Sequence, residues 1–238
     1  MSTLGGDEPD RGWMPPSTFI VVPAYNEGSV IGEVIRELRR LPATVVVIDD
    51  GSSDQTGAVA RNAGAVVVTH PLNRGQGAAL QTGLDYCLRR GAEVIATFDA
   101  DGQHSVEDVP RLVEPILRGE VDVVLGSRFL GTAENISFLR KVILKIGVHF
   151  TRVMSGARLT DAHNGIRAFS ASAASRIRLT QDRMAHASQI IDQIVAAELR
   201  FKEMPVSVRY TDYSKGKGQK SVGAVRVAVD YLMGRVAR

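Results

Sequence analysis

Short runs of β-branched and other apolar residues alternate with longer helical patterns up to residue 128, and this alternation determines the fold class. The apolar runs predict strands at residues 18–22, 44–48, 65–68, 93–98 and 121–125. The segments between them predict helices at residues 29–41, 54–63, 77–90 and 105–118. Strands that are apolar almost throughout and are joined by helical crossovers are typical of a parallel sheet covered on both faces. We therefore predict an α/β fold with a mostly parallel sheet flanked by helices.

The pattern becomes less regular after residue 128. It predicts helices at residues 136–158, 187–199 and 222–236, and strands at residues 165–169 and 204–210. A loop rich in glycine and lysine is predicted at residues 214–220. Residues 1–17 mix glycine, proline and acidic side chains without an apolar run, so we predict a disordered tail there. Residues 18–238 are expected to form a single domain.

The composition is that of an ordinary globular protein, with 44% hydrophobic and 23% charged residues and a net charge of +3. The only cysteine, Cys87, cannot form an internal disulfide, which favours a reducing, cytoplasmic location. No apolar run reaches the ~18 residues that a membrane-spanning helix needs. Contact with a membrane is therefore expected to be peripheral, at its cytoplasmic face, or to depend on a membrane-protein partner. Nothing predicts a nucleic-acid partner, and the sequence leaves open whether the chain forms a homo-oligomer.

Polar motifs follow three of the predicted strands at the point where each strand ends. They read Pro-Ala-Tyr-Asn-Glu at residues 23–27, Asp-Asp-Gly-Ser-Ser-Asp at residues 49–54 and Asp-Ala-Asp at residues 99–101. The carboxyl ends of parallel strands lie on one edge of a sheet, where ligands bind. Two carboxylates one residue apart can hold one hard divalent cation, which neutralises a bound diphosphate. Each motif alone is compatible with a simple turn or a capped loop, but the three together predict a nucleotide site.

These three motifs resemble the signature of family 2 glycosyltransferases with the GT-A fold. Within that family, Asn-Arg-Gly-Gln-Gly at residues 73–77, Gly-Ser-Arg at 126–128 and Asn-Gly-Ile-Arg at 164–167 resemble motifs of the polyprenyl-phosphate sugar synthases. Those enzymes include the dolichyl-phosphate mannose synthases and the bacterial lipid-carrier glucosyltransferases. The resemblance covers residues 18 to about 221. It implies a Rossmann-like GT-A fold with a nucleotide-sugar-binding half, 18–128, and an acceptor-side half, 129–238.

The resemblance also implies which residues bind the donor and a metal ion. It assigns the donor nucleotide sugar to Pro23, Tyr25, Glu27, Asp50, Asp99, Ala100, Asp101, Lys217 and Lys220. The first four would hold the base and ribose, and the two lysines would close over the diphosphate. The metal ligands it implies are Asp99, Asp101 and Gln103. Because this set is all oxygen, it suits Mg²⁺ or Mn²⁺ better than zinc.

The acceptor side implied by the resemblance consists of Arg128, Asn164, Gly165 and Arg167. Arg128 is expected to contact a phosphate as a bidentate donor and, with Asp101, to be a catalytic residue. The family motif usually reads Ser-Gly-Phe-Arg, so Asn164 and Ile166 are departures from it. The implied reaction is an inverting transfer of a hexose from a UDP- or GDP-sugar to a polyprenyl phosphate.

The residues around the acceptor motif leave a second reaction class open. A hydroxyl acceptor needs a carboxylate or histidine to remove its proton, and Asp161 and His163 are candidates for that role. A phosphate acceptor is already an anion and needs cations instead, which Arg128, Arg167 and the two C-terminal lysines would supply. A binding module without activity is a further alternative. The intact pair of Asp99 and Asp101 argues against it. A dinucleotide oxidoreductase is disfavoured, because no Gly-x-Gly-x-x-Gly turn follows the first strand.

Residues 136–158 are predicted to form an amphipathic helix on the acceptor side. An apolar stripe would consist of Ile136, Leu139, Val142, Ile143, Ile146, Phe150, Val153 and Met154. The basic residues are Arg140, Lys141, Lys145, Arg152 and Arg158, and the segment contains no acidic residue. This composition is typical of a helix that lies in a membrane interface, although a core-packed helix with a solvated basic face has the same pattern. Because the resemblance implies a lipid substrate, we favour the interfacial helix.

Overall fold

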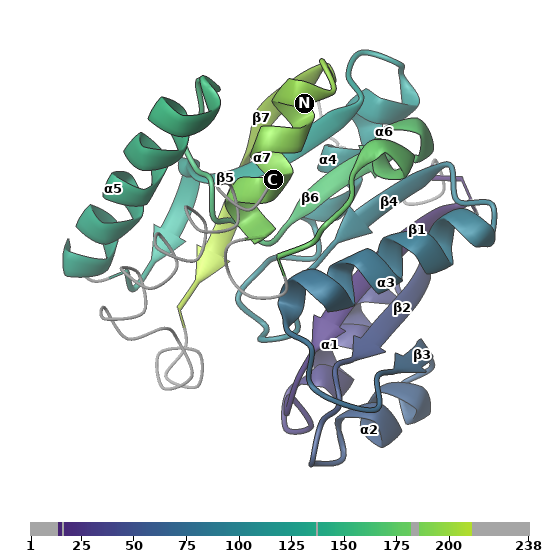
Figure 1. Ribbon diagram of the computed structural model, residues 1–238. Coiled ribbons are helices and arrows are strands. Elements are labelled where there is room, and N and C mark those ends of the chain that lie inside the picture. The colour runs from purple at the N-terminus through teal and green to yellow at the C-terminus, as the bar shows by residue number, and fades with distance from the viewer. Residues whose placement is uncertain (1–13, 16, 137, 182–185, 211–238) are drawn as a thin grey trace, which may run out of the picture.

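The computed structural model of the chain describes residues 14, 15, 17–136, 138–181 and 186–210. At its centre is a seven-stranded sheet with the order β3-β2-β1-β4-β6-β5-β7 (Figure 1). The first four strands, β1 (Thr18–Ala24), β2 (Thr44–Asp49), β3 (Val66–Thr69) and β4 (Val94–Thr97), pair in parallel. The predicted α/β fold with a mostly parallel sheet is therefore confirmed. The predicted glycine- and lysine-rich loop and the final helix lie outside the described residues.

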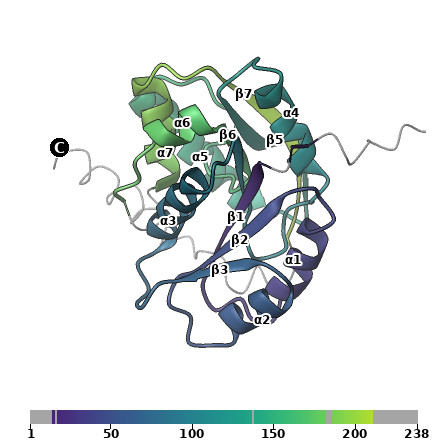
Figure 2. The ribbon, with the colours of Figure 1, turned by 90° about the vertical axis from the view of Figure 1, so that its right-hand side faces the viewer.

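Helices cover both faces of the sheet, as the nearly continuous apolar strands require. One face carries α1 (Ile31–Leu38), α2 (Thr56–Asn62) and α4 (Asp108–Leu117), and the other carries α3 (Gln76–Arg89), α6 (Ala171–Arg176) and α7 (His186–Ala196) (Figure 2). Alternate residues of β1 serve the two faces, because Ile20 and Val22 belong to one core cluster and Phe19 and Val21 to the other. Met14, within the predicted tail, is buried in the first cluster.

One strand runs against the others, and it decides what lies at the ligand-binding edge. Strand β6 (Arg167–Ser170) is inserted between β4 and β5 (Val123–Glu134) and is antiparallel to both. Arg167 is paired with Thr97, the last residue of β4. Because β6 is reversed, its amino end reaches the carboxyl edge of the parallel strands. Residues 160–166, which precede β6, therefore lie at the same edge as the three polar motifs.

Two elements differ from the sequence-based expectation. The sequence predicts that strand β5 ends at residue 125. In the structure β5 continues to Glu134, and its extension pairs only with the edge strand β7 (Phe201–Arg209). The pairing register shifts between Ser127 and Thr132. The short helix α6 was not predicted; the Ser170 hydroxyl caps it by accepting a hydrogen bond from the amide of Ala173 at 3.1 Å.

Helix α5 (Phe138–Ser155) follows β5 and contacts α7, and in Figure 1 it lies at the side of the molecule beside the β5–β7 ribbon. Within the described residues, no helix is both long and apolar enough to cross a lipid bilayer.

The close packing of α3 on β1 generates a stability prediction. A β-carbon at Gly83 of α3 would overlap with the side chain of Val21, which is fully buried. We expect Gly83→Ala to lower the free energy of unfolding, because overpacking costs ~1–3 kcal/mol and alanine's better helix propensity returns only ~1 kcal/mol. Urea unfolding measures the difference, with Arg89→Ala, an exposed site on the same helix, as the control. Equal or greater stability of Gly83→Ala would contradict the packing.

Candidate active site

The first two polar motifs are joined to each other by hydrogen bonds at the carboxyl edge. The side-chain oxygen of Asn26 accepts from the backbone amide of Ser53 at 2.8 Å. The backbone amide of Asn26 donates to the Ser52 hydroxyl at 3.0 Å. The amide of Glu27 donates to the Thr56 hydroxyl at 2.8 Å. Tyr25 remains exposed at this edge. The loops after β1 and β2 therefore form one continuous wall.

Asp50, at the end of β2, is buried and binds the turn that precedes α3. One carboxylate oxygen lies 2.7 Å from Nδ1 of His70 and accepts from the amide of Arg74 at 3.0 Å. The other oxygen accepts from the amide of Gly75 at 2.7 Å. Sequence reasoning missed His70, although a histidine two residues after a predicted strand was a usable signal. Its Nε2 lies 2.9 Å from the Thr82 hydroxyl, so the imidazole links Asp50 to α3.

The paired aspartates after β4 occupy different environments. Asp99 accepts from the side-chain amide of Gln76 at 3.1 Å and lies 3.3 Å from Nε2 of His104. Burial opposes its ionisation, but the hydrogen bond and charge of His104, with the charges of Arg167 and His186, hold its pKa below the ordinary value. For Asp101, burial and then the charge of Asp99 raise the pKa to about 6.

The aspartate pair fits a divalent cation shared with a ligand. Asp101 accepts from the backbone amide of Gln103 at 3.1 Å and from its side-chain amide, which brings the Gln103 side chain beside the carboxylate. Among the described residues, no group of three or more His, Cys, Asp or Glu side chains could hold a metal by itself. Mg²⁺ is commonly bound by one or two carboxylates and completed by substrate phosphates. The mutual repulsion of Asp99 and Asp101 is the electrostatic condition that such a cation relieves.

Gly165 brings the acceptor motif against the aspartates. A β-carbon at this position would overlap with the carboxylate of Asp99, so only glycine allows the approach. The carbonyl of Gly165 also accepts from the Thr97 hydroxyl at 2.7 Å. The loop at residues 160–166 is therefore fastened to the end of β4 beside the candidate metal ligands.

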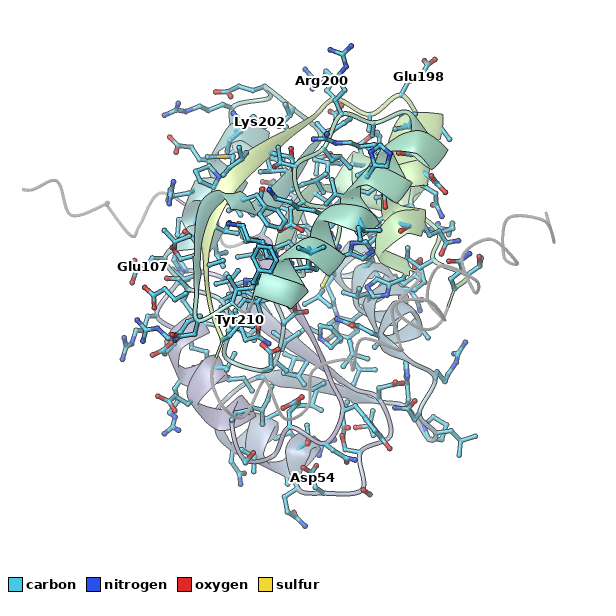
Figure 3. All side chains as sticks on the ribbon, turned by 90° about the vertical axis from the view of Figure 1, so that its left-hand side faces the viewer. Asp54, Glu107, Glu198, Arg200, Lys202 and Tyr210 are labelled. Carbon is cyan, nitrogen blue, oxygen red and sulfur yellow. The ribbon has the colours of Figure 1, made fainter. Side chains whose placement is uncertain are left out.

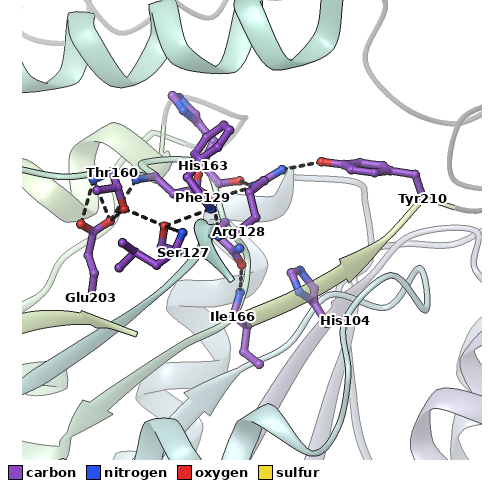
Figure 4. Close-up of polar contacts among 12 residues, drawn as sticks. His104, Ser127, Arg128, Phe129, Thr160, His163, Ile166, Glu203 and Tyr210 are labelled. Carbon is purple, nitrogen blue, oxygen red and sulfur yellow. Dashed lines mark hydrogen bonds and ion pairs between the residues drawn. The ribbon is translucent and has the colours of Figure 1, made fainter. Parts of the chain in front are cut away.

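Arg128 lies in the interior and binds groups of the chain itself. Its Nε donates to Asp161 at 2.6 Å, Nη1 donates to the Tyr210 hydroxyl at 2.7 Å and Nη2 donates to the carbonyl of His163 at 2.8 Å (Figure 4). Arg128 is 8% exposed and Asp161 is 2% exposed. Burial alone would lower the pKa of Arg128, but the charge of Asp161 raises it above the ordinary value.

Glu203 of β7 holds the other end of the same loop. Its carboxylate accepts from the amide and the hydroxyl of Thr160 and from the amide of Asp161, at 2.8–2.9 Å. The Thr160 hydroxyl lies 2.7 Å from that of Ser127, as Figure 4 shows. Sequence reasoning missed Glu203 and Tyr210, because only the pairing of β7 with β5 brings them to this loop.

Arg167 and Asn164 present hydrogen-bond donors without acceptors. Arg167 is 3% exposed, and within the described part of the chain its guanidinium makes no hydrogen bond. Burial lowers its pKa to about 10, which still leaves it cationic at neutral pH. Asn164 is buried, and its side-chain oxygen accepts from the amide of Ile166 at 3.1 Å, while its Nδ2 has no partner among the residues that the structure describes. Buried donors in this state can donate hydrogen bonds to the oxygens of an anionic ligand.

Most of the residues predicted for the site lie together at the carboxyl edge. Those expected to bind the donor lie at or directly after the ends of β1, β2 and β4, namely Pro23, Tyr25, Glu27, Asp50, Asp99, Ala100 and Asp101. Lys217 and Lys220 lie outside the described residues. The surface ion pairs of Arg200 with Asp122 and Lys202 with Glu120 belong to another region, because Figure 3 shows Arg200 and Lys202 at the opposite end of the molecule from Asp54.

Comparison with known proteins agrees with this geometry. Residues 19–178 match the family described as glycosyl transferase family 2. The chain is 38% identical to an uncharacterized protein of Methanocaldococcus jannaschii over 92% of both chains. It is 29% identical to the UDP-N-acetylglucosamine–dolichyl-phosphate N-acetylglucosaminyltransferase of Methanococcus voltae, over 90% of this chain and 94% of that one. It is 32% identical to the undecaprenyl-phosphate mannosyltransferase of Micrococcus luteus, over 88% and 89% of the two chains.

A solved structure shares the fold. Glucosyl-3-phosphoglycerate synthase from Mycobacterium tuberculosis, crystallised with Mn²⁺, UDP-glucose and phosphoglyceric acid, matches with a TM-score of 0.68 over 91% of this chain and 78% of that one. At 21% sequence identity the likeness is one of fold, and it confirms the expected GT-A architecture. Since the family match spans more than half of the chain and is joined by relatives above 30% identity, the chain belongs to glycosyltransferase family 2.

Proposed function

We propose that this protein transfers a hexose from a nucleotide sugar to a polyprenyl phosphate. The observation that carries the proposal is the buried guanidinium of Arg167, which makes no hydrogen bond within the described residues and is close enough to Asp99 to feel its charge. In the same segment, Nδ2 of Asn164 is also buried without a partner among the described residues. A phosphate monoester supplies the anionic oxygens that such donors need. Support also comes from relatives whose names specify dolichyl or undecaprenyl phosphate as the acceptor.

The donor would bind across the ends of β1, β2 and β4, with its diphosphate at Asp99 and Asp101. A bound Mg²⁺ or Mn²⁺ would neutralise the charge that develops on the leaving diphosphate. Asp99, Asp101 and Gln103 would hold that ion, and Gly165 would let the acceptor approach it closely. Pro23, Tyr25, Glu27 and Asp50 would contact the base and ribose of a UDP- or GDP-sugar. Direct attack by the acceptor phosphate on the anomeric carbon would invert its configuration.

A hydroxyl acceptor is disfavoured by the state of the two candidate bases. Asp161 is almost fully buried and is ion-paired with Arg128. Burial lowers the pKa of His163 to about 4, so this imidazole is a weak base at neutral pH. An efficient general base has a pKa near the operating pH, a condition that His163 does not meet, and the Asp161 carboxylate is already engaged by Arg128. A phosphate acceptor needs no base, which is consistent with the arrangement.

The exposed face of helix α5 supports docking on a membrane surface, which we propose to be the cytoplasmic one. Phe138 is 82% exposed and Ile146 is 64% exposed, and Val142, between them on the same helical face, is also exposed. Lys141 and Lys145 are exposed beside this apolar row, and the helix contains no acidic residue. An exposed apolar row flanked by lysines matches a membrane interface with anionic headgroups. The opposite side of the helix buries Val148 and Thr151, so α5 is also packed on the domain.

The proposed activity predicts metal-dependent labelling of a lipid. Wild-type protein with Mg²⁺ or Mn²⁺, a short polyprenyl phosphate and a panel of labelled UDP- and GDP-sugars should yield a labelled lipid. Asp101→Asn should fold normally but lose about a thousandfold in rate, because a carboxylate ligand of the ion is removed. EDTA should have the same effect on the wild type. Transfer to free sugars or alcohols but not to the lipid phosphate would contradict the acceptor, and full activity in EDTA would contradict the metal.

The low pKa of His163 predicts a pH dependence of stability. The unfolded chain takes up a proton near pH 6.5 and the folded chain only near pH 4, so the wild type loses stability as the pH falls through that interval. In His163→Gln this component is absent, so between pH 7 and pH 4.5 its free energy of unfolding should fall by ~1–3 kcal/mol less than that of the wild type. Urea unfolding at both pH values tests this. His149→Gln, at an exposed site of α5, should behave as wild type, and the same behaviour of His163→Gln would contradict the prediction.

The membrane proposal predicts salt-sensitive binding to anionic vesicles. The wild type should co-sediment with anionic liposomes at low salt and partly dissociate at 1 M salt, where the Debye length falls to ~3 Å. Replacing Lys141 and Lys145 together by glutamate should abolish binding while leaving transfer to a short, water-soluble polyprenyl phosphate intact. Arg39 and Arg40, exposed at the end of α1, provide a control with the same change of charge. If the control loses as much binding as the α5 variant, or the wild type ignores the liposomes, α5 is not the docking surface.

A further inference from the structure

The carboxylate of Asp50, directly after β2, is already bound on both oxygens by groups of the chain. Oδ1 lies 2.7 Å from Nδ1 of His70 and accepts from the backbone amide of Arg74 at 3.0 Å. Oδ2 accepts from the backbone amide of Gly75 at 2.7 Å. Each oxygen of a carboxylate accepts about two hydrogen bonds. Oδ1 is therefore filled, and one acceptor position remains on Oδ2.

His70 is held firmly in the position from which it occupies Oδ1. Because a carboxylate only accepts hydrogen bonds, the proton in its contact with Asp50 belongs to Nδ1 of His70. In the neutral imidazole, Nε2 then accepts from the hydroxyl of Thr82 on α3, 2.9 Å away. The backbone amide of His70 donates to the carbonyl of Asp49 at 2.9 Å. His70 and Asp50 are both buried, so turning the ring away would leave polar groups unsatisfied.

The turn that supplies the two backbone donors is equally constrained. A β-carbon on Gly51 would lie 2.6 Å from the carbonyl carbon of Leu72 and 2.7 Å from the amide nitrogen of Asn73. The backbone of the turn therefore lies directly against the loop after β2. The amides of Arg74 and Gly75 cannot withdraw from Asp50 unless this contact is broken.

Nucleotide bases differ in the number of donors that they present to a carboxylate. Guanine carries N1–H and an N2 amino group side by side, and this pair needs a free acceptor position on each carboxylate oxygen. Cytosine has an unprotonated N3 at the centre of the same edge. Uracil carries a single N3–H between two carbonyl groups. Since Asp50 has a free position on Oδ2 alone, it matches the edge with one donor.

We propose that Asp50, with Oδ1 occupied by His70 and Arg74, selects uracil, so that the donor is a UDP-sugar. This inference rests on the proposed function, in which Asp50 contacts the base, and narrows it to one class of nucleotide. Guanine could use only one of its two donors here, and the other would lose its partner on leaving water. His70 acts through Asp50 and is therefore a positioning residue that determines base specificity.

Binding of free nucleotides tests the selection without any acceptor. Wild-type protein is titrated calorimetrically with UDP, GDP and CDP in the presence of Mn²⁺, so that the diphosphate is the same and only the base differs. UDP should bind about 10- to 100-fold more tightly than GDP, because one donor of guanine has no acceptor on the charged carboxylate. Equal or tighter binding of GDP or CDP would overturn the inference.

Variants of His70 test the cause of the selection. His70→Phe keeps a ring but frees a position on Oδ1, so the ratio of the GDP and UDP dissociation constants should fall to within about threefold of unity. In His70→Asn the side-chain amide can replace Nδ1 as the donor, and the wild-type ratio should be kept. Thr82→Val is the matched control, because it removes the contact with Nε2 and leaves that with Asp50.

The outcomes separate this inference from the proposed function. A wild-type ratio in His70→Phe, or an equal fall in Thr82→Val, would overturn the role of His70. If His70→Phe does not fold, the wild-type titrations and His70→Asn still decide the selection. Lipid labelling from a GDP-sugar in preference to UDP-sugars would overturn the inference and leave the proposed transfer standing. Failure of the wild type to bind any of the three nucleotides would refute the proposed function itself.

Discussion

The antiparallel pairing of β6 with the end of β4 is the constraint on which the site depends. Pairing Thr97 with Arg167 brings the start of β6 to the carboxyl edge of the parallel strands. The absence of a side chain at Gly165 then allows the loop before β6 to lie directly on Asp99. A parallel β6 would have left these residues at the opposite edge. The donor motifs and the acceptor motif therefore meet because one strand of the sheet is reversed.

Charges at this edge are balanced only in part by the protein. Asp99 is compensated by His104, Arg167 and His186, whereas the pKa of Asp101 is raised because burial and Asp99 oppose its ionisation. Arg167 and Asn164 carry side-chain N–H donors that have no acceptor within the described part of the chain. A divalent cation and phosphate oxygens would satisfy both deficits at once. Because of this complementarity, we propose that the candidate metal site and the candidate acceptor site form one reaction centre.

The remaining polar contacts hold the loop at residues 160–166 in place next to the charged groups of the site. Glu203, Thr160 and Ser127 hold one end of the loop, and Arg128 with Asp161 holds the middle. Breaking such a buried pair is costly, but replacing both partners is often tolerated.

Local patterns in the sequence were sufficient for the strands up to residue 125, the helices between them and the three polar motifs at strand ends, because apolar periodicity and turn chemistry act over a few residues. They also led to Asp99, Asp101 and Arg167 as candidate site residues, which the structure brings to the same edge of the sheet. The direction of β6, the extension of β5 along β7 and the partners of Arg128 depend on residues far apart in the chain, such as Thr97 with Arg167 and Arg128 with Tyr210. The sequence by itself thus determined which chemical groups the protein carries and the fold that presents them. Only the tertiary structure decided that the guanidinium of Arg128 binds Asp161, Tyr210 and the carbonyl of His163, whereas that of Arg167 makes no hydrogen bond within the described residues, because hydrogen-bond partners are neighbours in space and not in sequence.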